Sequence, residues 1–223
     1  MGSENVKLVS WELSPVGRRV EWVLKLKGVD YEYVEEDIFN KTNLLLQLNP
    51  VHNKVPVLLH HHKPIAESLI ILQYIDQTWN QYPLFPQHPY QVALARFWGT
   101  VADKLAKTSY DAMCRSGDEQ EKKVNEAVEI MDKLEEEIMG KKFFGGEKIG
   151  YVDIAFGWIP WWLPVWEEVG SMQIVDPLKH PAISAWTTNF LTHTVIKDNL
   201  PPRDKLLLYA HGRKREFSSA LSG

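Results

Sequence analysis

The sequence predicts two domains, an α/β domain followed by an all-α domain. Strand and helix patterns alternate rapidly over the first eighty residues, three prolines fall within residues 82–89, and every pattern after them is helical. Hydrophobic residues make up 44% of the 223 residues, enough to bury a sizeable core. We therefore expect one domain at 1–82, a linker at 83–89 and a second domain at 90–223.

The α/β domain is expected to begin with a strand, a helix and a second strand. Residues 6–11 and 31–35 carry the β-formers typical of strands. Between them, Ser14 suits an N-cap, Pro15 suits the first helical position, and Gly28 suits a helix end. The apolar residues between these signals have helical spacing: Val16, Val20, Val23 and Leu24. Such a βαβ unit implies parallel pairing of its two strands.

The rest of the chain supplies further elements of both domains. We expect a short helix within 37–49, strands at 55–59 and 63–65, and a helix that opens at Glu67 and Ser68. In the second domain the expected helices are 90–115, 119–139, 152–169, 182–190 and 204–214. Two prolines, at 160 and 164, should kink the helix that contains them.

Composition excludes several classes of protein. The 25 Lys and Arg residues against 29 Asp and Glu give a net charge of −4, without the basic surplus of a dedicated nucleic-acid binder. The single cysteine, Cys114, cannot form an internal disulfide, and its helical context favours a buried, inert thiol. No apolar run approaches the ~20 residues that span a bilayer, and residues 1–11 do not resemble a signal peptide. We expect a soluble cytoplasmic protein without nucleic-acid or membrane partners.

Conventional metal and catalytic motifs are mostly missing from the sequence. It contains no Gly-rich phosphate loop, HExxH, CxxC or GxSxG. The consecutive histidines at 60–62 point in different directions in a strand or turn, which favours a solvated turn over a metal site. We expect no metal.

Polar groups instead gather where helices and strands begin. Ser14 lies at the positive end of a helix and can donate to an anion there, although its local sequence alone favours a plain N-cap. Pro56 precedes a short strand, and a cis bond there would free the backbone of Val55 for a peptide-like ligand. Glu67 and Ser68 start another helix. Basic residues lie on the connecting segments: Lys41 and Lys54. Together these groups suit a small zwitterion.

These segments resemble the glutathione transferase family, most closely its plant tau class. The resemblance lies in Ser14-Pro15, in the NPVHNKVPVL run at 49–58, in ESLII at 67–71 and in GYVDIA at 150–155. It extends over about residues 5–215. It implies a thioredoxin-like N-terminal domain for glutathione as co-substrate and an all-helical C-terminal domain with the hydrophobic co-substrate site. It also implies a homodimer with no tightly bound cofactor.

The resemblance further implies roles for individual residues. Ser14 would hydrogen-bond the glutathione sulfur, as a donor and not as a nucleophile. The other glutathione contacts would be the Val55 backbone beside a cis Pro56, Glu67 at the γ-glutamyl ammonium, Ser68 at its carboxylate, and Lys41 and Lys54 near the glycyl carboxylate. Since position 14 is serine and not cysteine, thiol–disulfide exchange is not expected as the main activity.

The co-substrate pocket is where the sequence departs from the tau pattern. The resemblance assigns five residues to this pocket: Val16, Lys107, Asp111, Trp162 and Tyr209. Val16 replaces the usual phenylalanine, and Lys107 and Asp111 stand where relatives often have tyrosine and arginine. Gly17, Arg18 and Arg19 also depart; the arginine pair would form a solvated face or lean toward an anionic co-substrate.

The function predicted from the sequence is conjugation of glutathione to small hydrophobic electrophiles, in detoxification or the stress response. One alternative uses the same thiolate to reduce organic hydroperoxides or to isomerise a substrate. Another is a carrier of flavonoid- or hormone-like aromatics with little turnover. The departures in the co-substrate pocket keep the carrier open, whereas an intact Ser14 with a complete glutathione set favours catalysis.

Overall fold

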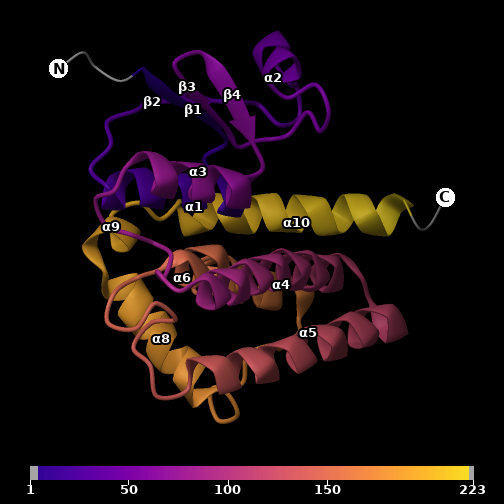
Figure 1. The fold of residues 1–223 in the computed structure, drawn as a ribbon. Helices are drawn as coiled ribbons and strands as arrows, with labels where there is room; N and C mark the ends of the chain where they lie inside the picture. Colours follow the sequence, from indigo (N-terminus) through magenta and orange to yellow (C-terminus); the bar gives the residue numbers. More distant parts are fainter. Residues whose placement is uncertain (1–4, 221–223) are drawn as a thin grey trace. The chain divides into compact units, whose positions relative to one another are not determined.

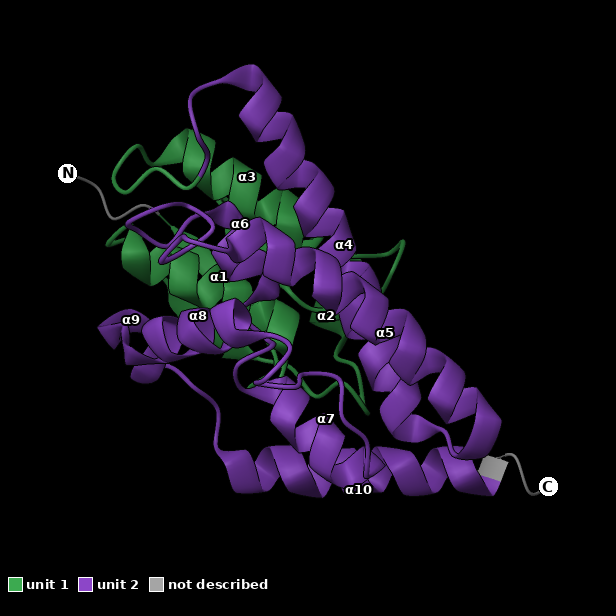
Figure 2. Cartoon of the chain, turned by 90° about the horizontal axis from the view of Figure 1, so that it is seen from below, with its two compact units in different colours: residues 1–84 green, residues 85–223 purple. Residues whose placement is uncertain are grey.

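In the computed structural model of the protein, residues 5–220 are described. The chain separates into two compact units, residues 1–84 and 85–223, which are coloured separately in Figure 2. The first unit contains every strand of the described chain, and the second contains helices only. The predicted fold class, an α/β domain followed by an all-helical one, is confirmed.

A four-stranded mixed sheet in the order β2-β1-β3-β4 organises the first unit. Strand β1 (Val6–Ser10) pairs in parallel with β2 (Glu32–Glu35) and antiparallel with β3 (Val57–His60). Strand β4 (Lys63–Ala66) pairs antiparallel with β3. Helix α1 (Pro15–Leu26) connects β1 to β2, so the predicted βαβ unit is confirmed.

Helices lie on both faces of this sheet. Helices α1 and α3 (Ser68–Thr78) lie side by side along one face (Figure 1). On the other face, Leu45 of α2 (Asn43–Leu48) joins Val9 and Val57 in one buried cluster. Because side chains alternate along a strand, the neighbouring Leu8 and Leu58 point to the opposite face, and both are fully buried.

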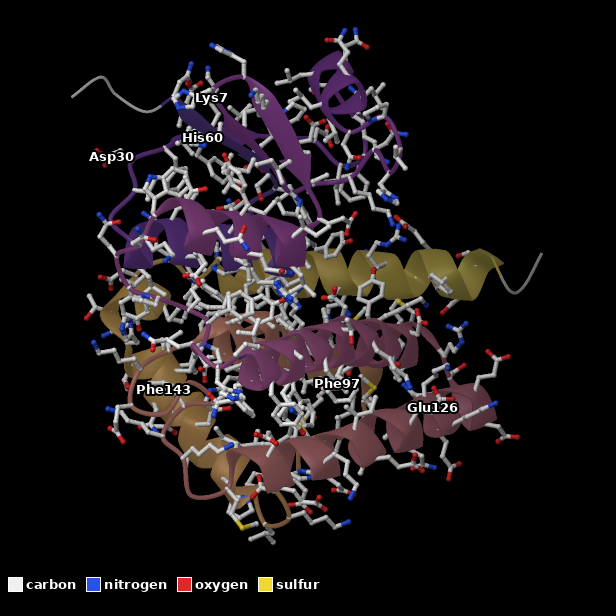
Figure 3. The ribbon with its side chains drawn as sticks, in the orientation of Figure 1. Lys7, Asp30, His60, Phe97, Glu126 and Phe143 are labelled. Atoms are coloured by element: carbon white, nitrogen blue, oxygen red, sulfur yellow. The ribbon has the colours of Figure 1, made fainter. Side chains whose placement is uncertain are left out.

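The turn between β3 and β4 agrees with its prediction at His61 and His62, which are exposed, and differs from it at His60. His61 and His62 form this turn with left-handed φ values of 49° and 64°. His60, on the strand next to that of Lys7 (Figure 3), is only 7% exposed, and its Nδ1 lies 2.6 Å from the Tyr74 hydroxyl of α3. A solvated turn is therefore wrong for His60, because its side chain packs toward α3.

Seven helices form the described part of the second unit. They are α4 (Pro89–Cys114), α5 (Gly117–Ile138), α6 (Tyr151–Phe156), α7 (Trp162–Gly170), α8 (Pro181–Thr192), α9 (Thr194–Lys197) and α10 (Arg203–Ala220). The single helix predicted over 152–169 is wrong, because the chain leaves the helix between α6 and α7, at Gly157 to Trp161. Pro160 lies in this break, and Pro164 lies in the first turn of α7, where its missing N–H breaks no helical hydrogen bond.

A buried carboxylate stabilises the start of α6. Asp153 accepts hydrogen bonds from the backbone N–H groups of Phe144, Gly145 and Gly150 and from the Trp186 indole, at 2.8–3.0 Å. These bonds tie the preceding loop and α8 to the helix. Across residues 5–220, no helix is long and apolar enough to cross a membrane.

Candidate functional site

Ser14 lies in the turn between β1 and α1. Its backbone N–H donates to the carbonyl of Trp11 at 2.9 Å, and its Oγ accepts from the N–H of Gly17 at 3.0 Å. The residue is only 4% exposed, and its backbone is extended, as an N-cap requires. The predicted N-cap is therefore confirmed. Because the oxygen acts as acceptor in this bond, the hydroxyl proton can be donated to an anion at the helix N-terminus.

Arg18 holds this turn from the helix side. Its Nη2 donates to the carbonyl of Glu12 at 2.8 Å, and its Nη1 pairs with Glu21 at 2.9 Å. From the sheet side, Glu35 accepts from the N–H of Glu12 at 3.1 Å. Burial raises the pKa of Glu21, and the Arg18 charge opposes that shift. Arg18 is thus tied to the turn that carries Ser14 and does not form a solvated face.

A second polar position is the N-terminus of α3. Ser68 is its first residue, only 7% exposed, and its Oγ accepts from Nη1 of Arg19 at 3.1 Å. Arg19 is 1% exposed, so it does not belong to a solvated face either. Glu67 has a left-handed φ of 69°, a strained conformation for a residue with a Cβ. Its half-exposed carboxylate lies 3.8 Å from Nε2 of His52.

The segment before β3 adds backbone groups and two lysines. The peptide bond between Val55 and Pro56 is cis, as expected. Asn49, 5% exposed, donates to the carbonyl of Lys54 at 2.9 Å and accepts from the N–H of His52 at 3.2 Å. These two bonds fix the loop between α2 and β3. The side chains of Lys41 and Lys54 are exposed on the segments that flank α2.

The residues expected at the co-substrate pocket have varied surroundings. In the first unit, Val16 is half-buried in the first turn of α1. In the second unit, Lys107 and Asp111 form an ion pair of 2.6 Å one turn apart on α4, so that their opposite charges lie side by side. Trp162 is 1% exposed, so it is packed as a core residue with little surface for a ligand. Tyr209 is half-buried on α10.

The second unit also holds polar and thiol groups near α10 that the sequence analysis assigned no site role. Nε of Arg213 donates to the Tyr110 hydroxyl at 3.2 Å, and burial raises the pKa of Tyr110. Cys114 is 2% exposed, and burial raises its pKa, as expected of an inert thiol.

In the first unit, Arg19 and Asn49 have supporting roles that no sequence motif indicates. Arg19 precedes Val23 by four residues, so the helical stripe itself could have indicated that Arg19 points inward.

Comparison with known proteins decides the family. A model of the glutathione S-transferase N-terminal domain matches residues 4–77, and a model of the C-terminal domain of the same family matches residues 83–193. The chain belongs to the glutathione S-transferase family. It is 46% identical over 222 residues to glutathione transferase GST 23 of Zea mays, covering 99% of this chain and 100% of the relative.

Two solved structures resemble this transferase closely. The tau-class glutathione S-transferase of mango, Mangifera indica, has a TM-score of 0.87 and 39% identity, covering 92% of this chain and 97% of its own. Rice GST1, solved in complex with glutathione, has a TM-score of 0.89 and 32% identity. The match covers 97% of this chain and 99% of the rice chain. The resemblance to the plant tau class and its thioredoxin-like N-terminal domain is therefore confirmed, and the protein is an enzyme of the glutathione transferase type.

Proposed function

We propose that this transferase stabilises the glutathione thiolate with the hydroxyl of Ser14 and conjugates it to small hydrophobic electrophiles. One observation carries the proposal: the buried Ser14 Oγ caps α1 through the Gly17 N–H, which leaves its proton to donate at a helix N-terminus. Glutathione bound to the rice relative supports the same co-substrate here.

The energetics of this hydrogen bond are sufficient for activation. A free thiol has a pKa of about 8.5, so only a few per cent is thiolate near neutral pH. A hydrogen bond to a charged group contributes about 1.5–3 kcal/mol, and one pKa unit corresponds to about 1.36 kcal/mol. Ser14 can therefore lower the pKa of the bound thiol by about one to two units.

We propose that the remaining glutathione contacts come from the same unit. The exposed carboxylate of Glu67 suits the γ-glutamyl ammonium, and Ser68 at the start of α3 suits its carboxylate. The Val55 backbone would pair with the cysteinyl part beside the cis Pro56. The exposed lysines that flank α2 would attract the glycyl carboxylate: Lys41 and Lys54.

We propose Lys107, Asp111 and Tyr209 of the second unit as contacts of the hydrophobic co-substrate, and the assignment of Val16 stays a prediction from the resemblance. Trp162 would support this region from the core, because it is buried. Because the Lys107–Asp111 ion pair has no net charge, it suits an uncharged electrophile better than an anion. Two alternatives to conjugation stay open. One is a glutathione-dependent peroxidase or isomerase that would use the same thiolate, and the other is a carrier of aromatic ligands.

We also propose a cytoplasmic homodimer. Three apolar residues on one face of α4 are well exposed in the single chain: Tyr90, Leu94 and Phe97 (Phe97 is labelled in Figure 3). Their spacing of four and three residues places them in one stripe. Light scattering on the wild type and on Phe97→Glu tests the dimer; a monomeric wild type would contradict it.

The function is tested by conjugation of glutathione to chlorodinitrobenzene across pH, with Ser14→Ala beside the wild type. We expect the apparent thiol pKa to rise by about one to two units in the variant, with loss of most of kcat. Ser109→Ala is the matched control, because Ser109 is a fully buried serine of α4 whose Oγ has no hydrogen-bond partner among residues 5–220. If the wild type and Ser14→Ala bind glutathione but are equally inert, the carrier alternative replaces the transferase mechanism.

A further inference from the structure

Gly17 stands where a helix normally disfavours glycine. It is the third residue of α1, it is buried, and its φ is not left-handed. A glycine inside a helix costs about 1 kcal/mol relative to alanine. Since backbone conformation does not require glycine here, the explanation must lie in the space around it.

That space is occupied by two serines. A Cβ atom on Gly17 would lie 2.1 Å from Oγ of Ser10, and 3.2 and 3.3 Å from Cβ and Oγ of Ser14. Non-bonded heavy atoms prefer separations of about 3.5–4.0 Å. The contact with Ser10 would therefore be a severe overlap, while the contacts with Ser14 would need shifts of only a few tenths of an ångström.

The backbone of Ser10 cannot retreat from such a clash. Ser10 is the last residue of β1, it has no exposed surface, and it is in register with Glu35 of β2. Its carbonyl also accepts from the N–H of Glu36 at 2.7 Å. Its Oγ finds no hydrogen-bond partner among residues 5–220, so packing alone positions it. A Cβ at position 17 would thus either turn the Ser10 hydroxyl into another rotamer within its closed packing or push the first turn of α1 away from β1.

We propose that Gly17 is a positioning residue for Ser14. The missing side chain lets the first turn of α1 close against β1, and the Gly17 N–H then holds Ser14 Oγ at 3.0 Å. This proposal rests on the function proposed above for Ser14. It also explains why one of the positions that depart from the tau pattern is a buried glycine beside the candidate catalytic residue.

The test is a double-mutant cycle of Gly17→Ala and Ser10→Ala. Gly17→Ala should raise the pKa of the bound glutathione thiol, read from the ultraviolet absorbance of the thiolate, and lower kcat about tenfold, because small misplacements of catalytic groups are costly. KM for glutathione should change less, since Glu67 and Ser68 lie on other elements. Ser10→Ala alone should leave kcat and the pKa of the bound thiol unchanged.

The combined variant decides between steric positioning and other causes. Because Ser10→Ala removes the atom at 2.1 Å, it should restore most of kcat and of the thiol pKa in Gly17→Ala. Gly212→Ala is the control: Gly212 lies in α10 with open space where a Cβ would be, so this variant should keep full activity. Helix propensity favours alanine at both positions, so it cannot explain a loss at position 17 alone.

Two outcomes would overturn the proposal. One is Gly17→Ala with wild-type kcat and thiol pKa; the other is a defect in Gly17→Ala that Ser10→Ala does not relieve. Urea unfolding of the same four proteins, wild type included, gives a readout that does not need activity, because relief of the clash should also restore stability. If the wild type makes no conjugate, the proposed function fails, while the unfolding cycle still shows whether positions 10 and 17 are coupled.

Discussion

Replacing Lys27 by methionine should destabilise the first unit by about 3–5 kcal/mol. Lys27 follows α1, and its side chain has no exposed surface. Its ammonium group donates to the carbonyls of Trp79, Gln81 and Tyr82, each at 2.9 Å, and pairs with Asp76 at 2.7 Å. One side chain thus ties the end of α1 to the end of α3 and to the segment that follows it.

The magnitude follows from what the substitution removes. Methionine is unbranched and similar in length, so little of the loss comes from a cavity. Hydrogen bonds to a charged group contribute about 1.5–3 kcal/mol each, but the bonds of Lys27 share one desolvation cost, so they do not add. Breaking a buried ion pair by removing one partner costs about 3–5 kcal/mol, out of a total stability of about 5–15 kcal/mol.

Urea unfolding measures this loss, and hydrogen–deuterium exchange over residues 68–82 localises it. Lys25→Met is the matched control, because Lys25 is exposed near the end of α1 and its Nζ lies 5.9 Å from the centre of the Tyr31 ring, so the substitution should cost less than about 1 kcal/mol. Adding Asp76→Asn to Lys27→Met should cost less than the two single losses combined, since the second change removes a carboxylate that has already lost its cation. A Lys27→Met variant as stable as Lys25→Met would refute the reasoning.

Three further predictions concern other sites. If Ser68 holds the γ-glutamyl carboxylate as proposed and Arg19 positions its hydroxyl, Arg19→Gln should raise KM for glutathione with little change in kcat and should add little to the KM effect of Ser68→Ala. Steady-state kinetics that showed independent effects on KM would contradict this. Asp153→Ala should destabilise the second unit by more than about 3 kcal/mol in thermal unfolding, since four donors lose their acceptor. Asp153→Asn should cost less, and equal losses of stability in the two variants would be inconsistent with a hydrogen-bonding role. Cys114 should stay unreactive toward iodoacetamide at mildly alkaline pH in the native protein, because burial both shields the thiol and raises its pKa, which lowers the thiolate fraction; labelling as fast as in urea would disprove this.

The elements of the first unit could be predicted because their signals are local. Ser14 and Pro15 mark the start of α1, and Gly28, with a φ of 66°, follows its end. The break between α6 and α7 has a local signal in Pro160, but the apolar residues on both sides continue the helical pattern, so the sequence predicts a kink where the chain leaves the helix. The burial of His60 depends on Tyr74 of α3, and no pattern within the turn itself contains that information.

In the candidate site, too, local features could be predicted from the sequence and contacts between distant residues could not. Ser14, Glu67 and Ser68 could be placed at helix starts from the sequence, because capping and helix termini are local features. The direction of Arg19 could have been inferred from its spacing, but its partner could not, since Ser68 is 49 positions away. The close approach of position 17 to Ser10 likewise depends on the packing of α1 beside the end of β1, which no local pattern contains.

The tertiary contacts of residues 16–19 explain what this segment does in the fold. Taken as a sequence, it departs from the tau pattern, and its arginines were open to a solvated or an anion-binding role. In the structure Gly17 packs against Ser14, Arg18 ties the turn before it, and Arg19 reaches Ser68. Neighbours in one helical turn thus support two different parts of the proposed glutathione site. If Ser14 holds the thiolate and Ser68 the γ-glutamyl carboxylate, as proposed, changes at position 17 should appear in kcat and the thiol pKa, whereas changes at position 19 should appear in KM. Such a separation between adjacent residues would not arise if the turn had only a general structural role.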